Sequence, residues 1–159
     1  VKVGTGGNVT LYNEVGTKTE LAEAVVLNEM FRFLYLVEAA FAAHPNDLVE
    51  AIRMAVRTVL ELGEVDPMLN AAVGASHGAP SDLLPLLTTN ATPVLDGALG
   101  AMLTLLAPYR VRLEPAHLTV AVDSLVRVMI SRLMQPNGTP SEAADAVAWV
   151  AAQLLPLDD

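Results

Sequence analysis

Glu114 and His117 are the pair of residues with the most direct chemical potential, because they lie three positions apart. In a helix this Glu-x-x-His spacing puts a carboxylate and an imidazole on one face, as in the di-iron helical bundles. Such a site needs two copies of the pattern and two further helix carboxylates, and the sequence has one copy. Glu114 also precedes Pro115, a position typical of a helix start. We therefore predict no metal site.

Other patterns that could support catalysis are incomplete. The glycine-rich start of the chain resembles a dinucleotide-binding loop, but Val9 stands where the third glycine of Gly-x-Gly-x-x-Gly belongs. The three histidines, His44, His77 and His117, are far apart, and the first two fall at predicted helix ends. There is no cysteine, which excludes thiolate chemistry and disulfides. The sequence predicts a protein that is not an enzyme and needs no cofactor.

The composition predicts one all-α domain. Of the 159 residues 53% are hydrophobic but only 4% aromatic, so the core is built from alanine, leucine, valine and methionine. Alanine and leucine favour helix over strand. A net charge of −9 argues against non-specific binding to nucleic acid. No signal peptide and no uncharged apolar run of membrane-spanning length are present, so we expect a cytoplasmic protein that does not contact a membrane.

Capping residues, prolines and glycines give the expected helix boundaries. A capping box at Thr17–Glu20 begins the first long helix, and Thr139–Glu142 combines a second box with Pro140 at the first helical position. Gly63 is a typical helix stop. The predicted helices span residues 17–43, 48–62, 66–73, 82–89, 92–107, 114–134 and 139–155.

Methionine and aromatic side chains recur on several of these helices. Methionine adapts to irregular cavities, and pockets between the helices of a bundle are common sites for small molecules. The predicted ligand-binding residues are Phe33, Met54, Met68, Met102, Leu103, Leu106 and His117. The alternative is that they simply fill the core. Arg53 and Arg57, one turn apart, are interpreted as a solvated face rather than an anion anchor.

The last two predicted helices are apolar on several sides, so they need cover from more than one direction. Small side chains along the final helix would let another helix approach closely. Two such helices from each of two chains would form a four-helix interface. The predicted interface residues are Leu118, Val122, Leu125, Met129, Ala144, Val147, Ala148 and Ala151. Burial within one chain explains the same pattern, and the pattern alone does not separate the two.

The segment Thr10–Leu21 resembles the tetracycline-repressor-like (TetR) family of bacterial transcription regulators. It contains Thr10-Leu11-Tyr12, a small-residue turn at Gly16, Thr17-Lys18 and then Leu21. Residues 83–89, Leu-Leu-Pro-Leu-Leu-Thr-Thr, are similar to a second family segment. The order of helix lengths and breaks also resembles the family's ligand-binding body. The resemblance implies a TetR-like bundle of about seven helices after a partial helix-turn-helix.

The resemblance also implies a function. Residues 1–16 would be a remnant of the DNA-binding head, and residues 17–159 a body that binds a ligand and dimerises. Thr10, Tyr12 and Asn13 would lie on the recognition helix, and Lys18 would contact phosphate. The expected partners are operator DNA, a hydrophobic small molecule and a second copy of the chain, in a ligand-responsive repressor. The alternative is a helical interaction or scaffold protein without a ligand.

Overall fold

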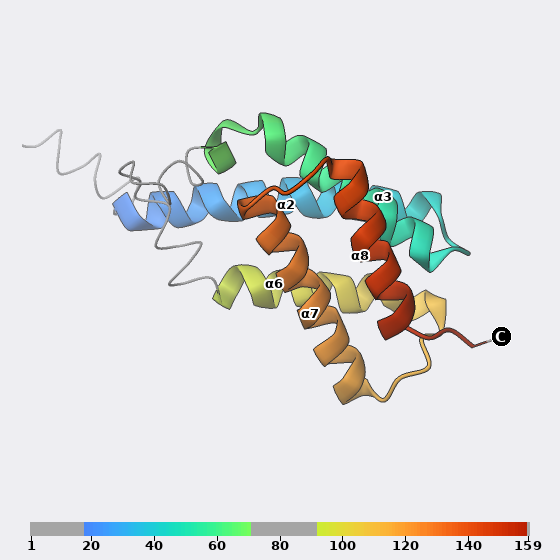
Figure 1. Ribbon diagram of the computed structural model, residues 1–159. Coiled ribbons are helices and arrows are strands. Elements are labelled where there is room, and N and C mark those ends of the chain that lie inside the picture. Colours follow the sequence, from blue (N-terminus) through green and yellow to red (C-terminus); the bar gives the residue numbers. More distant parts are fainter. Residues whose placement is uncertain (1–17, 71–91, 159) are drawn as a thin grey trace, which may run out of the picture.

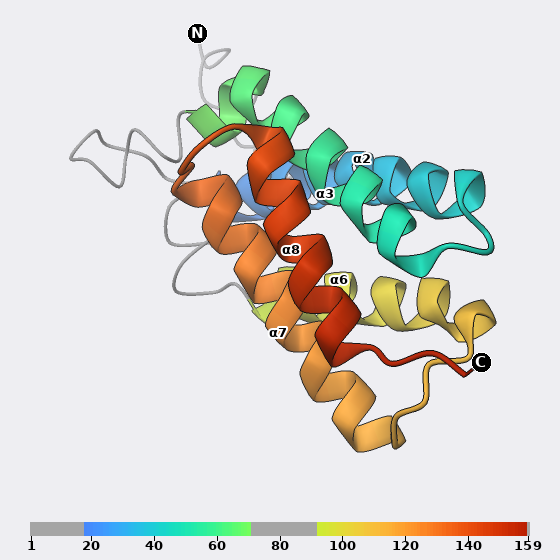
Figure 2. The same ribbon diagram turned by 45° about the vertical axis from the view of Figure 1, so that its right-hand side comes forward.

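The structure, a computed structural model, describes residues 18–70 and 92–158. The described residues form helices connected by short turns, which confirms the predicted all-α fold (Figure 1). The complete elements in these ranges are α2 (Lys18–Ala43), α3 (Leu48–Val65), α6 (Thr92–Leu106), the 3-10 helix η1 (Ala107–Tyr109), α7 (Pro115–Met134) and α8 (Pro140–Leu154). In both views α2 and α3 lie side by side, α8 crosses α3, and α7 crosses α6 (Figures 1 and 2).

The turn between α2 and α3 follows from its polar residues. α2 ends at Ala43, as predicted, just before the segment His44–Asp47. Asp47 is the N-cap of α3, and its carboxylate accepts a hydrogen bond of 2.9 Å from the amide of Glu50. The cap satisfies one of the free amides that every helix start exposes. The two helices are therefore joined by a short, well-defined connection.

The end of α3 corrects one prediction. The helix continues through Gly63 to Val65, so the expected stop at the glycine is wrong. A Cβ atom on residue 63 would collide with Cδ1 of Leu133 on α7. Gly63 thus serves a contact between two helices, and no helix end occurs there.

Asp66 ends α3 and begins the next helical turn. Its side chain is 1% exposed, and its Oδ1 accepts hydrogen bonds of 3.0 Å from the amides of Met68 and Leu69. Its Oδ2 accepts a third bond of 3.0 Å from Arg32 on α2. The predicted helix start at Asp66-Pro67 is confirmed, with residues 67–70 helical. The rest of that helix, the predicted helix at 82–89 and Thr17 of the first capping box lie outside the described residues.

The predicted starts of α7 and α8 are also confirmed. α7 begins at Pro115 after Glu114, whose side chain makes no capping hydrogen bond. α8 begins with the complete capping box, in which Thr139 accepts from the amide of Glu142 and the Glu142 carboxylate accepts from the amide of Thr139. These hydrogen bonds from Thr139 hold the pKa of Glu142 below its usual value.

Alanines bring α8 close to α3. Ala144, Ala148 and Ala151 on α8 are at most 1% exposed, and Ala51 on α3 is also fully buried. Small side chains on both helices let their backbones approach closely, which explains why α8 has little exposed surface on this side. Beyond α8 the chain turns back, and Leu157 pairs with Val111 in an isolated antiparallel bridge.

Tyr109 attaches the end of η1 to the end of α2. Its hydroxyl donates to the carbonyl of His44 at 2.8 Å and lies 3.2 Å from that of Phe41. Its ring meets the Phe41 ring edge to face, with centroids 5.8 Å apart. Burial, and then the nearby charge of Asp47, raise the pKa of the Tyr109 hydroxyl. This contact closes the end of the bundle opposite to Asp66.

The described helices include none long and apolar enough to cross a membrane.

Replacing Tyr109 with Phe should lower the free energy of unfolding by about 1 kcal/mol, because the His44 carbonyl just after α2 loses its partly buried hydroxyl donor. Chemical denaturation followed by circular dichroism measures the change. Tyr35→Phe is the control, because Tyr35 is 70% exposed and its removal should leave stability unchanged. Equal stability of the two variants would show that the hydroxyl contact does not stabilise the fold.

Candidate functional site

An apolar cavity lies in the centre of the described helices. It has a volume of about 80 Å³, and all five α-helices named above contribute to its wall. Its lining consists of hydrophobic residues, namely Leu34, Val37, Phe41, Ile52, Ala55, Val56, Val59, Ala98, Met102, Leu106, Val122, Leu125, Val126, Met129, Val147 and Leu155. A cavity without a polar group in its lining can recognise a ligand only by shape and apolar contact.

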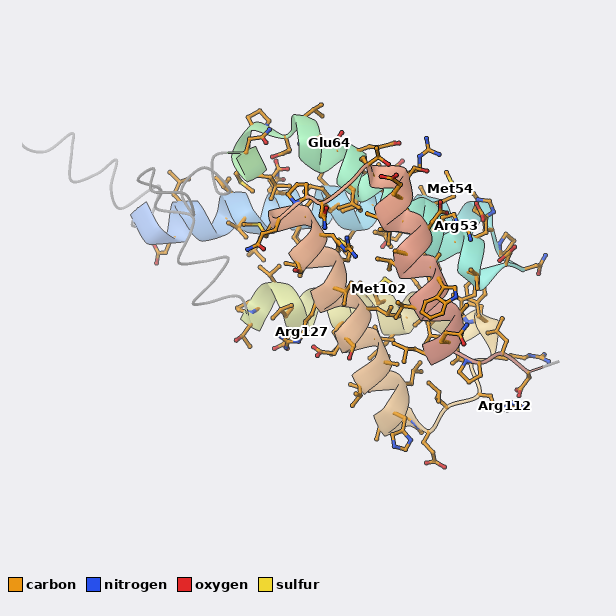
Figure 3. All side chains as sticks on the ribbon, viewed as in Figure 1. Arg53, Met54, Glu64, Met102, Arg112 and Arg127 are labelled. Atoms are coloured by element: carbon orange, nitrogen blue, oxygen red, sulfur yellow. The ribbon has the colours of Figure 1, made fainter. Side chains whose placement is uncertain are left out.

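The cavity is formed by the same periodicity that builds the helices. On α3, Ile52, Val56 and Val59 recur at helical spacing and are buried. Met102 of α6 enters the same space and lies within the body of the molecule (Figure 3). Met129 reaches it from α7. Because methionine side chains are unbranched and flexible, this part of the wall can change shape more easily than the rest.

Two of the predicted ligand-binding residues, Met102 and Leu106, line the cavity. Phe33, Met54 and Leu103 are partly buried against the core but are not part of its lining. Met68 is half-buried in the turn that Asp66 caps, and His117 is exposed in the first turn of α7. The structure thus brings together two of the seven and places the other five elsewhere.

Apart from Phe41 and Met129, the lining residues that sequence reasoning missed are aliphatic, and Met129 is one of the residues predicted at the dimer interface. Most of the lining comes from valine, alanine, leucine and isoleucine on α2, α3 and α7. Their helical spacing marks them as core residues, and that signal is identical for a packed core and for a cavity wall. Of the three methionines predicted to bind ligand, only Met102 lines the cavity.

Most of the residues predicted at a dimer interface are already buried within this chain. Val122, Leu125, Ala144, Val147, Ala148 and Ala151 are all at most 7% exposed. Their side chains belong to the chain's own core, where the alanines meet α3. These six side chains offer no surface to a second copy. They fit the alternative stated above, in which the apolar pattern reflects burial within one chain. Leu118 and Met129 are half-buried and pack against the same core.

The opposite faces of α7 and α8 carry exposed hydrophobic residues. Val120 and Val128 on α7 are two turns apart and exposed, and Trp149 on α8 is 68% exposed. Leu154 at the end of α8 is exposed as well. The two helices lie on the same side of the molecule in both views (Figures 1 and 2). The exposed set of Val120, Val128 and Trp149 is called the outer face below.

Charged residues of α3 form ion pairs at the surface. Arg53 pairs with Glu50, and its Nε lies 2.9 Å from Oδ1 of Asp145 on α8. Arg57 donates to Glu61 at 2.8 Å, which raises the pKa of the guanidinium. Arg57 is exposed on a solvated face, as interpreted from the sequence, whereas Arg53 is half-buried and its Nε is buried against α8. Neither arginine lines the cavity.

The remaining candidate residues do not form a catalytic or metal-binding group within the described part. Glu114 and His117 are both exposed. Among the described residues no three histidine or carboxylate side chains converge to hold a metal ion. Thr10, Tyr12 and Asn13 lie outside the described residues, and of Lys18 the structure describes only its place as the first residue of α2.

Comparisons with known proteins identify the class of protein to which this helical fold belongs. The family described as the bacterial tetracyclin repressor, C-terminal domain, matches residues 47–153. This match covers more than half of the chain, which therefore belongs to the TetR family of transcriptional regulators. This is a family of regulators rather than of enzymes.

Two relatives are similar to almost the whole chain. The HTH-type transcriptional regulator AlkX of Mycobacterium tuberculosis (strain ATCC 25618 / H37Rv) is 25% identical over 147 residues, which are 92% of this chain and 67% of that protein. The crystal structure of the TetR family repressor AlkX from Dietzia sp. strain DQ12-45-1b, implicated in biodegradation of n-alkanes, superimposes with a TM-score of 0.73 at 27% identity. That comparison covers 91% of this chain and 77% of the other.

Replacing Ala148 with Arg should unfold the chain or lower its free energy of unfolding by about 3 kcal/mol or more, because an unpaired charge enters a fully buried contact. Thermal unfolding followed by circular dichroism measures this. Ala42→Arg is the matched control, since Ala42 is exposed near the end of α2. If Ala148→Arg were as stable as the control, α8 would not pack on α3 through its alanines.

Proposed function

We propose that this regulator binds operator DNA as a dimer and releases it when an apolar molecule enters the central cavity. The observation that supports this most strongly is the hydrophobic lining of that cavity, to which α2 contributes Leu34, Val37 and Phe41. α2 directly follows the segment Thr10–Thr17, which resembles the reading helix of the family. A ligand that displaces α2 would therefore displace the DNA-contacting residues.

The size of the cavity supports a ligand-driven change. At about 80 Å³ it is smaller than the dry cavity of about 150 Å³ that binds benzene in another protein. A ligand must therefore enlarge it by moving side chains or helices. Because packed interiors rearrange between discrete states and resist continuous deformation, such a movement is transmitted to neighbouring helices.

The proposed effector is a molecule with an unbranched hydrocarbon chain. Five helices enclose a space with no polar residue in its wall, which favours an apolar ligand over a charged one. The AlkX repressor from Dietzia is implicated in biodegradation of n-alkanes, and an n-alkane would match the apolar lining of this cavity once the cavity is enlarged. Flexible Met102 and Met129 give the wall the freedom to accommodate an aliphatic chain.

The proposed DNA contacts are Thr10, Tyr12, Asn13 and Lys18. Base contacts from a recognition helix would specify the operator, and Lys18 would contact phosphate. General electrostatic attraction to DNA is weak, because the whole chain carries a net charge of −9. Specific contacts from the N-terminal segment must therefore supply the affinity.

The effector proposal predicts that a larger side chain in the cavity abolishes the response to the ligand but leaves the affinity for DNA unchanged. Operator sequences are first selected from a random oligonucleotide pool with the purified protein, and affinity is then measured by fluorescence anisotropy. Saturating n-octane or 1-octanol should weaken the binding about five-fold or more, a typical coupling between two sites. Ala98→Leu should abolish this response while DNA affinity is retained, because the added carbons occupy the cavity.

Ala101→Leu is the matched control, since Ala101 lies on the same helix, is half-buried and does not line the cavity. It should respond to octane as the unchanged protein does. A response that survives in Ala98→Leu would place the effector outside the cavity. A protein that selects no DNA sequence at all would support the scaffold alternative.

The proposed dimer uses the outer face. The predicted interface residues on the inner side of α7 and α8 are occupied by the chain's own core, so the same two helices must pair through their exposed side. Trp149 supports this, because a tryptophan 68% exposed is a typical interface anchor. Small Ala152, also exposed on α8, would let a second helix pack beside Trp149.

Trp149→Arg should convert the dimer to a monomer without unfolding it, because the charge would be buried unpaired in the interface. Light scattering coupled to size-exclusion chromatography measures the mass, for comparison with 16.8 kDa per chain. Tyr35→Arg is the control, being 70% exposed on α2 and outside the outer face. A Trp149→Arg dimer, or a Tyr35→Arg monomer, would assign the interface to another surface.

A further inference from the structure

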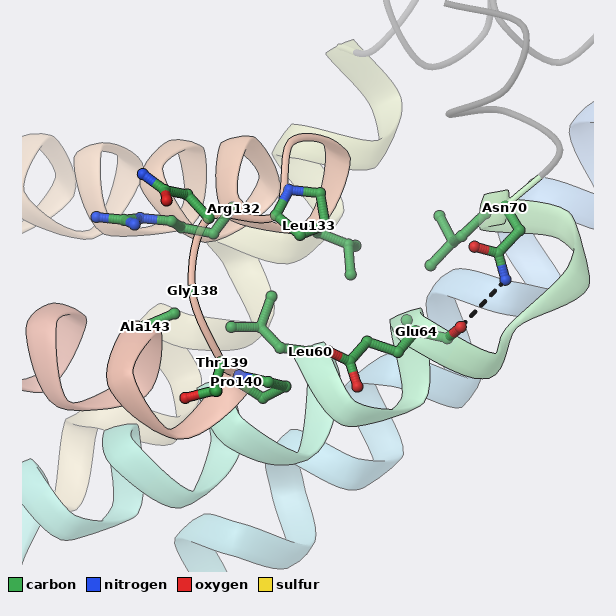
Figure 4. Close-up of a pocket in the computed structure, with 13 residues that line it drawn as sticks. Leu60, Glu64, Asn70, Arg132, Leu133, Gly138, Thr139, Pro140 and Ala143 are labelled. Atoms are coloured by element: carbon green, nitrogen blue, oxygen red, sulfur yellow. Dashed lines mark hydrogen bonds between the residues drawn. The ribbon is translucent and has the colours of Figure 1, made fainter.

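A second pocket lies apart from the central cavity. It is about 210 Å³ in volume and lies between the ends of α3 and α7, the turn at residues 67–70 and the connection from α7 to α8 (Figure 4). None of its lining residues lines the central cavity. The proposed effector therefore does not account for this pocket.

The floor of the second pocket is apolar. Leu60, Leu69, Leu133 and Ala143 form it, together with the rings of Pro136 and Pro140. Gly63 lies between two of these leucines: a Cβ there would collide with Cδ1 of Leu133 and lie 3.7 Å from Cδ1 of Leu69. The glycine thus lets Leu133 lie directly over the backbone of α3. The result is a floor that offers hydrocarbon contact to a flat or compact ligand.

The rim carries two side chains of opposite charge, Glu64 and Arg132, which point in different directions. In Figure 4 the Glu64 carboxylate lies beside Leu60, whereas Arg132 extends along α7 away from Leu133. Within the described part of the chain, the Glu64 side chain takes part in no hydrogen bond or ion pair. The amide of Asn70 donates to the Glu64 backbone carbonyl at 3.2 Å and leaves the carboxylate available.

We propose that the second pocket binds a small organic ammonium ion with an apolar body. The body would contact Leu60 and Leu133, and the ammonium group would pair with the Glu64 carboxylate. The net charge of −9 favours the approach of a cation over that of an anion. The volume exceeds the roughly 150 Å³ that accommodates benzene, so one ring with a short amine arm fits.

Three ligands of equal size separate the possible chemistries. Benzylamine, benzyl alcohol and benzoate share one ring and differ in the charge of the arm. Each is titrated into the full chain, and binding is followed by NMR of isotope-labelled methyl groups. Benzylamine should saturate and shift the methyl signals of Leu60, Leu69 and Leu133. Benzyl alcohol and benzoate should bind at least about five-fold more weakly, because they lack the charge that pairs with Glu64.

Glu64→Gln tests the pairing directly and should weaken benzylamine binding by about five-fold while leaving benzyl alcohol unaffected. The control is Glu61→Gln, one turn earlier on α3, whose carboxylate pairs with Arg57 and does not line the pocket. Glu61→Gln should bind benzylamine as the unchanged protein does. This result would show that the affinity depends on the ion pair with Glu64 and not on the overall negative charge of the chain.

Four results would overturn the proposal. These are equal or tighter binding of benzoate, equal loss in the two glutamine variants, methyl shifts centred on Ile52 of the central cavity, and no saturable binding of benzylamine. The first would assign the pocket to Arg132 and an anion. The proposal does not depend on the proposed regulation of DNA binding, because each readout is made on the protein alone.

Discussion

The contact between α3 and α8 is the constraint on which the other features depend. Ala51 on one helix and Ala144 and Ala148 on the other are fully buried, and their size sets how closely the two backbones approach. Once α8 is held there, its opposite side faces solvent with Trp149. The central cavity then lies on one flank of this contact, and the second pocket lies where the chain enters α8. A bulkier residue in the contact would disturb all three features together.

Local signals in the sequence predicted most helix ends. The capping box at Thr139 and the proline at 115 act within a few residues, so the starts of α7 and α8 were readable from the chain alone. The helix end predicted at Gly63 was wrong for a physical reason. Its function is to admit Leu133, a residue 70 positions later, and no local pattern carries that information.

The site was less predictable than the fold. Met102 and Leu106 could be predicted because an adaptable side chain and helical spacing mark them in the sequence. The orientation of α8 could not be predicted. This helix is apolar on two sides, and the periodicity of its sequence does not distinguish the side that faces α3 from the side that faces solvent. That choice depends on the alanines of α3, which are remote in sequence. Glu64 gave no signal at all, because a lone acidic residue near a helix end is typical of a solvated surface.

The hydrocarbon wall of the central cavity has a consequence for a homologous series of ligands. With no polar partner to satisfy, each methylene that enters contributes mainly its transfer from water, about 0.8 kcal/mol, or roughly four-fold in affinity. Affinity should therefore rise geometrically with chain length and then stop abruptly when the wall can yield no further. Under the proposed function the site would therefore respond to molecular length, with its threshold set by the stiffness of the surrounding helices rather than by any recognised chemical group.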